Sequence, residues 1–176
     1  MRRSPSRRHK RAASVNNDQN AEDTAQYFQI SINVLEARKL AWSNPHSANS
    51  YVIIVLGKKK RRTSTRRNME EPYYREYFVF EMFASIRDVQ RSSIWLAVME
   101  PRCCAPPRLL GETNINLGTI WTQPYHQIFH KWAQLSLPRE PTAGPVGFLK
   151  VDISIIFRGD MLQMVPAMVN EETVEE

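Results

Sequence analysis

Apolar and polar residues alternate along much of this chain, which is the pattern of β-strands that bury one face. The first such segment begins near Tyr27, where Phe28, Ile30 and Ile32 alternate with polar neighbours. Later segments that alternate, or that collect β-branched and aromatic residues, span 51–56, 73–82, 93–99, 109–117, 132–137 and 146–157. With a basic segment after Gly57, they make about eight strands at the spacing of a β-sandwich. The sequence therefore predicts an all-β, antiparallel domain.

The segment 93–99 differs from the others because both of its faces are apolar, with Leu96 on one and Trp95 on the other. Such a segment is typical of a strand that is covered on both sides, so we expect it to lie centrally in the sandwich. Between the strands, 83–91 is predicted to be a connection with one helical turn. The longer aromatic segment 119–131 is predicted to be partly helical.

Both ends of the chain are polar and lack an apolar period. The first 14 residues hold six bases and no acid, so we expect residues 1–26 to form a disordered basic arm. A folded domain is expected over 27–158, followed by a linker and an acidic tail over 159–176. A solvated tail is the plain interpretation of the arm, with a nuclear signal, kinase sites or RNA binding as alternatives.

Basic residues dominate the charge balance and point to anionic partners. The formal net charge is +6 and the isoelectric point is near 9.5, which favours lipid headgroups or nucleic acid. The six bases of residues 1–14 equal this whole excess, so residues 15–176 are neutral overall. They are strongly polarised, because seven further bases lie within 58–67.

The two cysteines, Cys103 and Cys104, are adjacent and cannot build an ordinary disulfide framework. A reducing, cytoplasmic compartment is therefore expected. No apolar run reaches the roughly 18 residues of a membrane span, and the N-terminus lacks the apolar core of a secretory signal.

Three short motifs lie at positions where one family of β-sandwich domains has similar motifs. They are Asn49-Ser50-Tyr51-Val52, Glu71-Pro72-Tyr73-Tyr74 and Leu110-Gly111-Glu112. In this order and spacing they resemble the C2 domain. The resemblance implies an eight-stranded antiparallel C2 β-sandwich with disordered tails.

The second half of the chain narrows the resemblance. Its motifs are Leu117-Gly118-Thr119-Ile120-Trp121, His130-Lys131-Trp132 and Gly147-Phe148-Leu149-Lys150-Val151. Over residues 27–160 the chain resembles the second C2 domain from the N-terminus of a ferlin. This implies a peripheral membrane protein in vesicle trafficking, membrane fusion or plasma membrane organisation. Ferlins are far longer and end in a transmembrane helix, so we interpret the chain as a fragment, a short isoform or a truncated relative.

The resemblance also places the positions at which calcium-binding C2 domains carry carboxylates. They fall on Asn44, Asn49, Glu100, Arg102 and Arg108. Calcium takes roughly six to eight oxygen ligands, whereas this set offers one carboxylate and two arginines that repel a cation. We therefore expect a degenerate calcium site and no cofactor.

The basic segment Lys58–Arg62 is the main candidate for binding. In an extended strand its bases divide into Lys58, Lys60 and Arg62 on one face and Lys59 and Arg61 on the other. Each base beside an anionic leaflet contributes on the order of 1 kcal/mol. The sequence thus predicts calcium-independent binding to an anionic phospholipid surface, assisted by Arg102 and Arg108.

Other interpretations of this surface stay open. Bases also protect a sheet edge from pairing with another chain. A protein-interaction module, in which the patch meets an acidic partner, is the main alternative function, and nucleic-acid binding is the least favoured. Cys103 and Cys104 at the loop tip are either plain thiols or sites of acylation that add an anchor.

Catalytic chemistry has little support in the sequence. His126 and His130 have the spacing of two zinc ligands on a helix, but no third ligand accompanies them. Packing explains them better. We find no nucleophile elbow, phosphate-binding glycine loop or carboxylate pair, so we expect a binding module and no enzyme.

Overall fold

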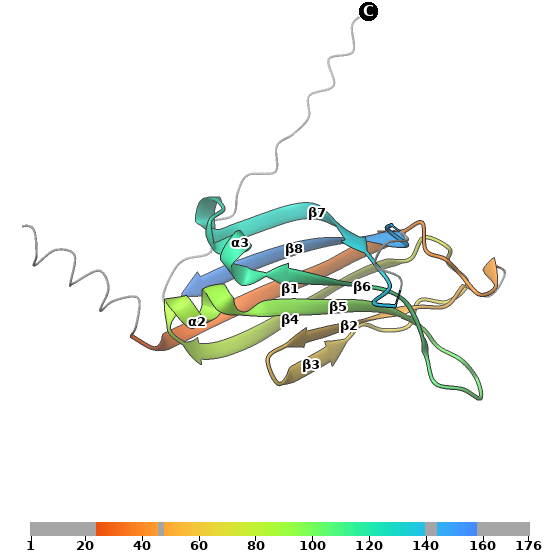
Figure 1. Ribbon diagram of the computed structural model, residues 1–176, viewed down its shortest axis with the longest axis horizontal. Helices are drawn as coiled ribbons and strands as arrows, with labels where there is room; N and C mark the ends of the chain where they lie inside the picture. Colours follow the sequence, from red (N-terminus) through yellow and green to blue (C-terminus); the bar gives the residue numbers. More distant parts are fainter. Residues whose placement is uncertain (1–23, 46–47, 140–143, 158–176) are drawn as a thin grey trace, which may run out of the picture.

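The described part of the chain folds as eight strands in two antiparallel sheets that pack face to face (Figure 1). The computed structural model describes residues 24–45, 48–139 and 144–157. The fold class expected from the sequence is confirmed. The expected acidic tail and all but the last three residues of the expected arm lie outside the described residues.

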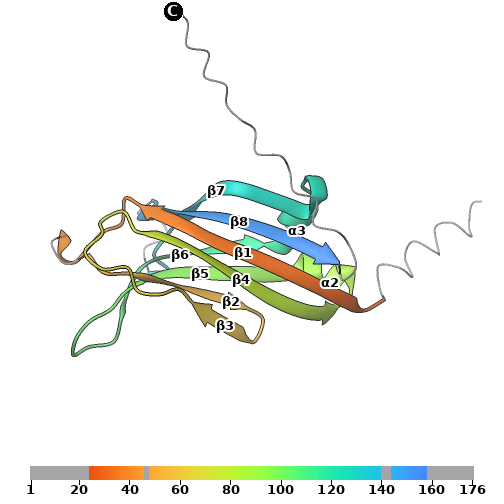
Figure 2. The same ribbon diagram turned by 180° about the vertical axis from the view of Figure 1, so that it is seen from behind.

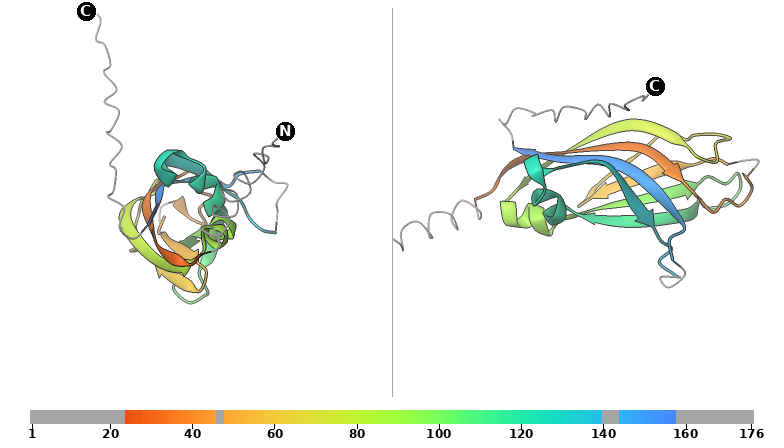
Figure 3. Two further views of the ribbon diagram at one scale, coloured as in Figure 1. Left: turned by 90° about the vertical axis from the view of Figure 1, so that its left-hand side faces the viewer. Right: turned by 90° about the horizontal axis from the view of Figure 1, so that it is seen from above.

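Each sheet has four strands. The first has the order β4-β1-β8-β7 and consists of β1 (Gln26–Arg38), β4 (Tyr73–Ala84), β7 (Gln127–Leu135) and β8 (Gly147–Phe157). The second has the order β3-β2-β5-β6 and consists of β2 (Tyr51–Leu56), β3 (Lys59–Arg62), β5 (Ser93–Glu100) and β6 (Arg108–Asn116). The end-on view in Figure 3 shows the strands surrounding a common interior.

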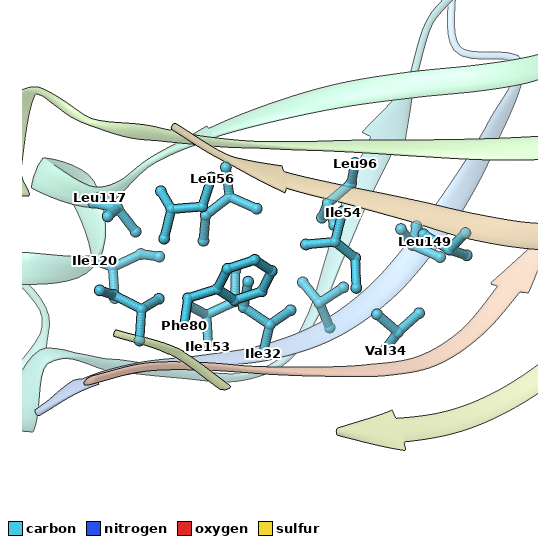
Figure 4. Close-up of a cluster of buried hydrophobic side chains, with 14 of the residues drawn as sticks. Ile32, Val34, Ile54, Leu56, Phe80, Leu96, Leu117, Ile120, Leu149 and Ile153 are labelled. Atoms are coloured by element: carbon cyan, nitrogen blue, oxygen red, sulfur yellow. The ribbon is translucent and has the colours of Figure 1, made fainter. Parts of the chain in front are cut away.

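Alternate side chains of the central strands fill the space between the sheets. Ile32 and Val34 of β1 are fully buried, as are Ile54 of β2 and Leu96 of β5. Figure 4 shows Ile32 and Phe80 of the first sheet within the same apolar cluster as Ile54 of the second. Each buried aliphatic side chain of this size contributes about 1.5–3 kcal/mol. Burial of the alternate apolar residues seen in the sequence is therefore the main source of stability.

Short helices cover one end of the sandwich, and loops gather at the other (Figures 1 and 2). The helices are α2 (Ile86–Arg91) and α3 (Leu117–Trp121), followed by the 3-10 turn η2 (Pro124–His126). Ser85 and Asn116 each accept a backbone N–H of the first turn, which explains where the two helices begin. Among the described helices, none has the length and apolar character needed to cross a bilayer.

β5 lies inside its sheet, between β2 and β6, and is apolar on both faces, as expected. On its outer face Ala97 is buried beside Tyr51 and Ile53 of β2, and Trp95 packs partly buried against them. We call this group the outer apolar cluster. It lies next to β3, so apolar and basic side chains share one surface of the sandwich.

β7 starts earlier and β4 ends later than the sequence predicts. β7 begins at Gln127 rather than at residue 132, because Ile128 pairs with Ile153 of β8 and is drawn into the sheet. β4 continues to Ala84, because Phe83 pairs with Tyr27 at the start of β1. Pairing with a distant strand extends both elements beyond what the local pattern shows.

The two histidines do not share a helix face. His126 lies in η2, stacked on Trp121 with 4.0 Å between the ring centroids. His130 lies at the register shift of β7, where its backbone N–H donates to Asp152. The packing interpretation agrees with the stacked ring of His126, whereas the side chain of His130 is exposed. The helical spacing of two zinc ligands does not agree with this geometry.

Candidate functional site

The basic segment forms the second half of a hairpin at the edge of its sheet. β2 ends at Leu56, Gly57 and Lys58 make the turn, and β3 follows. Gly57 has a φ of +58°, a left-handed conformation that favours glycine. Within its sheet β3 pairs with β2 alone, and the side chains of all four of its residues are exposed.

The outer face of this hairpin presents positive charge. Arg62 lies opposite Ile53 of the outer apolar cluster, so Arg62 and its alternate neighbour Lys60 face away from the core. The guanidinium of Arg62 lies 5.0 Å from the ring centre of Tyr51, a cation–π contact that orients it. Within the described residues, the ammonium groups of Lys58 and Lys60 have no protein partner. These two charges are available to an external anion.

The inner face of the same strand is used by the protein itself. Lys59 lies opposite Leu56, a core residue, so its side chain points toward the other sheet. There its ammonium group donates to the backbone carbonyl of Glu81 in β4, at 2.5 Å. β3 and β4 are edge strands of different sheets, so this bond joins the sheets where no strand pairing does. Arg61 donates to the carbonyl of Lys60.

At the loop end, Glu100 and Arg108 form an ion pair that is partly closed off from solvent. Glu100 ends β5 and is only 6% exposed. Its carboxylate accepts from the hydroxyl of Ser43 at 2.5 Å and from the Ser43 backbone N–H at 3.3 Å. Nη1 of Arg108 donates to the hydroxyl of Ser43 at 2.6 Å, the carbonyl of Ala41 at 3.3 Å and the carboxylate of Glu100 at 3.5 Å. We call this group the loop clamp, because it ties the loop after β1 to both ends of the β5–β6 loop.

The loop clamp does not fit calcium. The ion would need carboxylate and carbonyl oxygens from these two loops, and the carboxylate of Glu100 already faces the positive charge of Arg108. Asn44 and Asn49 bring amides instead of carboxylates. Arg102 is exposed in the loop between β5 and β6. Among the described residues, no three His, Cys, Asp or Glu side chains lie close enough to hold a metal.

Sequence reasoning missed the partners of Arg108. Ser43 lies in a polar loop of no distinctive pattern, and the carbonyl of Ala41 belongs to the main chain, so neither carries a sequence signal. Only the approach of the two loops brings them to the guanidinium. Contact of Arg108 with lipid stays a prediction.

A second charged cluster lies on the outer face of the first sheet. Glu36 is 6% exposed and accepts from Lys150 at 3.1 Å and from Arg38 at 3.0 Å. Both cations also lie over the ring of Trp132. Burial alone would raise the pKa of Glu36, but the hydrogen bonds and charges of Lys150 and Arg38 outweigh it and hold the pKa below its ordinary value. The bases here are paired with a carboxylate, unlike those on the outer face of β3.

The two-sheet sandwich with loops at one end and a basic hairpin at one edge agrees with a match to a known domain family. The C2 domain family matches residues 28–135, more than half of the chain. The chain belongs to the C2 domain family and is, at the level of class, a membrane-binding module.

Two of its relatives are ferlins. The chain is 33% identical over 138 residues to Fer-1-like protein 4 of Mus musculus, and 27% identical over 135 residues to myoferlin of Homo sapiens. These alignments cover 78% and 77% of this chain but only 7% and 6% of the two relatives. The ferlin resemblance of the C2 region is confirmed. Correspondence to the second ferlin C2 domain stays a prediction.

Solved structures share the fold. The tandem C2 domains of calcium-bound extended-synaptotagmin 2 match 82% of this chain, which covers 48% of that chain, with a TM-score of 0.60 and 23% identity. Human GIVD cytosolic phospholipase A2 matches 77% of this chain, which covers 18% of that chain, with a TM-score of 0.60 and 20% identity. At these identities the likeness supports the fold alone, so neither calcium nor phospholipase activity carries over.

Proposed function

We propose that this C2 domain binds anionic phospholipid surfaces without calcium, through the outward face of the β2–β3 hairpin. The observation that carries the proposal is the exposure of Lys58, Lys60 and Arg62, with no carboxylate paired to them in the described residues. The ferlin relatives favour a setting in membrane fusion, vesicle trafficking or plasma membrane organisation. The domain would act as a peripheral protein on the cytoplasmic side of a membrane.

The size of the electrostatic contribution suits reversible recruitment. Three bases held near an anionic leaflet contribute about 3 kcal/mol in total at modest salt. That energy corresponds to roughly a hundredfold gain in affinity. The contact with Tyr51 holds Arg62 in an outward position, so less side-chain entropy is lost when the guanidinium meets a lipid phosphate.

The loop clamp supports independence from calcium. The guanidinium of Arg108 supplies the positive charge that joins the two loops. Because this charge belongs to a side chain of the protein, no bound cation is needed to join them. In this proposal Arg108 positions the loop end and, together with the exposed Arg102, assists the contact with lipid. No cofactor takes part, and the domain has no catalytic role.

Vesicle co-sedimentation tests the proposal. The chain is mixed with phosphatidylcholine vesicles, with or without phosphatidylserine, in calcium or in chelator. We expect binding to the anionic vesicles alone and to the same extent with and without calcium. Because Lys60 and Arg62 each contribute on the order of 1 kcal/mol, the variant Lys60→Gln/Arg62→Gln should bind about tenfold or more weakly.

The matched control is Arg91→Gln/Lys131→Gln, which removes the same charges from α2 and from β7, at the far edge of the other sheet. It should bind like the unaltered chain. An equal loss in the control would show that net charge, and not the hairpin, determines binding. Binding that requires calcium, or no binding to anionic vesicles, would contradict the proposal and leave the protein-interaction module as the alternative.

A further inference from the structure

Beside the loop clamp, a shallow polar pocket of about 410 Å³ opens at the loop end of the sandwich. Three connections meet around it. Asn49 comes from the loop before β2, Thr65, Arg67 and Asn68 come from the loop after β3, and Arg102 with its two neighbours comes from the loop after β5. The lining therefore combines two guanidinium groups, two amides and a hydroxyl, without a carboxylate.

Backbone hydrogen bonds hold one wall of this pocket in place. Ser50 and Arg66 exchange two of them, at 2.9 and 2.8 Å. The N–H of Asn68 donates to the side-chain carbonyl of Asn49 at 3.1 Å. Both sequence neighbours of Arg67 are thus tied to the segment before β2, so the backbone of Arg67 has a defined place at the pocket.

Among the described residues, no acidic side chain pairs with either arginine of the pocket. In the described part of the chain, neither Arg67 nor Arg102 has an ion-pair or hydrogen-bond partner, and both are exposed. The acid nearest to Arg102 in sequence is Glu100, whose carboxylate is engaged within the loop clamp by Ser43 and Arg108. The carboxylate of Glu100 is therefore already engaged by the loop clamp beside this pocket.

We infer that this pocket binds a phosphate monoester, with Arg67 and Arg102 as its cationic ligands. A guanidinium presents a planar fork of N–H donors that matches two phosphate oxygens. Thr65 and Asn68 add a hydroxyl and an amide to the donor set. A phosphate monoester carries a charge of about −1.5 to −2 at neutral pH, which suits two arginines, whereas a metal ion would be repelled by them.

The pocket continues the basic face of the hairpin toward the loop end. The chain runs from Arg62 at the end of β3 directly into the segment that holds Arg67. Figures 1 and 2 show β3 and the loop after β5 toward the same side of the sandwich. The phosphate can come from a membrane headgroup or from a soluble molecule. If the phosphate belongs to a membrane headgroup, the inference rests on the proposed function. If the phosphate belongs to a soluble molecule, it does not.

Titration with soluble inositol 1,4,5-trisphosphate tests the pocket without a membrane. Amide NMR shifts should change most at Thr65, Asn68 and Arg102, and inorganic phosphate should shift the same signals more weakly. Because a charge-assisted hydrogen bond is worth roughly tenfold in affinity, Arg67→Gln/Arg102→Gln should bind at least about tenfold more weakly. The control Arg91→Gln/Lys131→Gln should leave the affinity unchanged. Since all four side chains are exposed, far-UV circular dichroism should show intact folding.

Vesicles of equal surface charge separate the two sources of phosphate. One set contains phosphatidylinositol 4,5-bisphosphate and the other phosphatidylserine. We expect tighter binding to the phosphoinositide set, and loss of that preference in Arg67→Gln/Arg102→Gln with most phosphatidylserine binding kept.

The outcomes distinguish the pocket from the hairpin. Shifts confined to Lys58–Arg62, or an unchanged affinity of the double variant for the soluble ligand, would overturn the pocket and leave the proposed function standing. Soluble ligand bound at the pocket without binding to either vesicle set would overturn the proposed function and assign the pocket to a free phosphate.

Discussion

At the scale of single residues, the two buried carboxylates among the described residues each lie beside a cation. Glu36 accepts from Lys150 and Arg38, and Glu100 accepts from Ser43 and faces Arg108. Burying a charge is costly unless it is paired and hydrogen-bonded, which explains why both carboxylates carry such partners. The bases on the outer face of β3 have no such carboxylate, so the positive charge of the fold is directed outward there.

Glu36 should make stability depend on pH. Its pKa is lower in the folded chain than the ordinary value of 4.5. Its contribution is therefore complete above that value and is lost as the pH falls through the lowered folded pKa. Glu36→Gln should reduce the free energy of unfolding near neutral pH and flatten its decline in acid, measured by urea unfolding across that range. Glu81→Gln, an exposed position on the same sheet, is the control. Equal losses at neutral and acid pH would show that the contribution of Glu36 is not electrostatic.

At the scale of elements, the two sides of the sandwich are closed differently. On one side, β3 and β4 are unpaired edges joined by the bond from Lys59 to the carbonyl of Glu81. On the other, β6 approaches the segment after β7, and Glu112 pairs with Ser136 in a single bridge. The side between β3 and β4 is joined by a polar contact and stays accessible to solvent and ligands. The side between β6 and the segment after β7 is closed by backbone pairing and close packing.

Gly111 makes that close packing possible. A Cβ at this position would lie 2.8 Å from Cβ of Leu135 and 2.8 Å from Cγ2 of Val146. Cβ of Leu135 is fixed to its backbone, so Gly111→Ala should destabilise the domain by about 1–3 kcal/mol through overpacking. Urea unfolding measures the loss. In a double-mutant cycle, Val146→Ala should cost less in the Gly111→Ala background because it removes one of the contacts. Simple additivity would rule out this contact as the cause.

At the scale of the whole molecule, the exposed bases of the hairpin and the polar pocket lie along one side. The basic hairpin lies beside the outer apolar cluster, and the polar pocket lies at the loop end of the same side. The helices lie at the opposite end of the sandwich. This arrangement supports the proposed binding to an anionic surface.

Binding to anionic vesicles should weaken steeply with salt. The Debye length falls from about 10 Å at 0.1 M to about 3 Å at 1 M, so attraction by exposed bases is largely screened over this range. Vesicle affinity measured against salt concentration should fall, and Lys60→Gln/Arg62→Gln should show a shallower slope than Arg91→Gln/Lys131→Gln. Affinity that does not depend on salt would contradict electrostatic binding through the hairpin.

Much of the fold could be predicted because the pattern of each strand is local. The run 51–56 coincides with β2, and 146–157 differs from β8 by one residue, since a period of two is visible in any half-buried strand. The start of β7 could not be predicted, because Ile128 joins the sheet through its pairing with Ile153. The loop clamp and the pocket were equally hidden, because their members lie far apart in sequence.

The sequence by itself determined the C2 sandwich, its alternating core and the concentration of bases in one strand, and it predicts a degenerate calcium site. These follow from residue type and local period. Only the tertiary structure decided that Lys59 faces the other sheet while Lys60 and Arg62 face outward, that Arg108 is engaged by Ser43 and Glu100, and that Arg67 and Arg102 line one pocket. The physical reason is that sheet register and loop approach set the direction and neighbours of each charge, and both depend on contacts between distant segments.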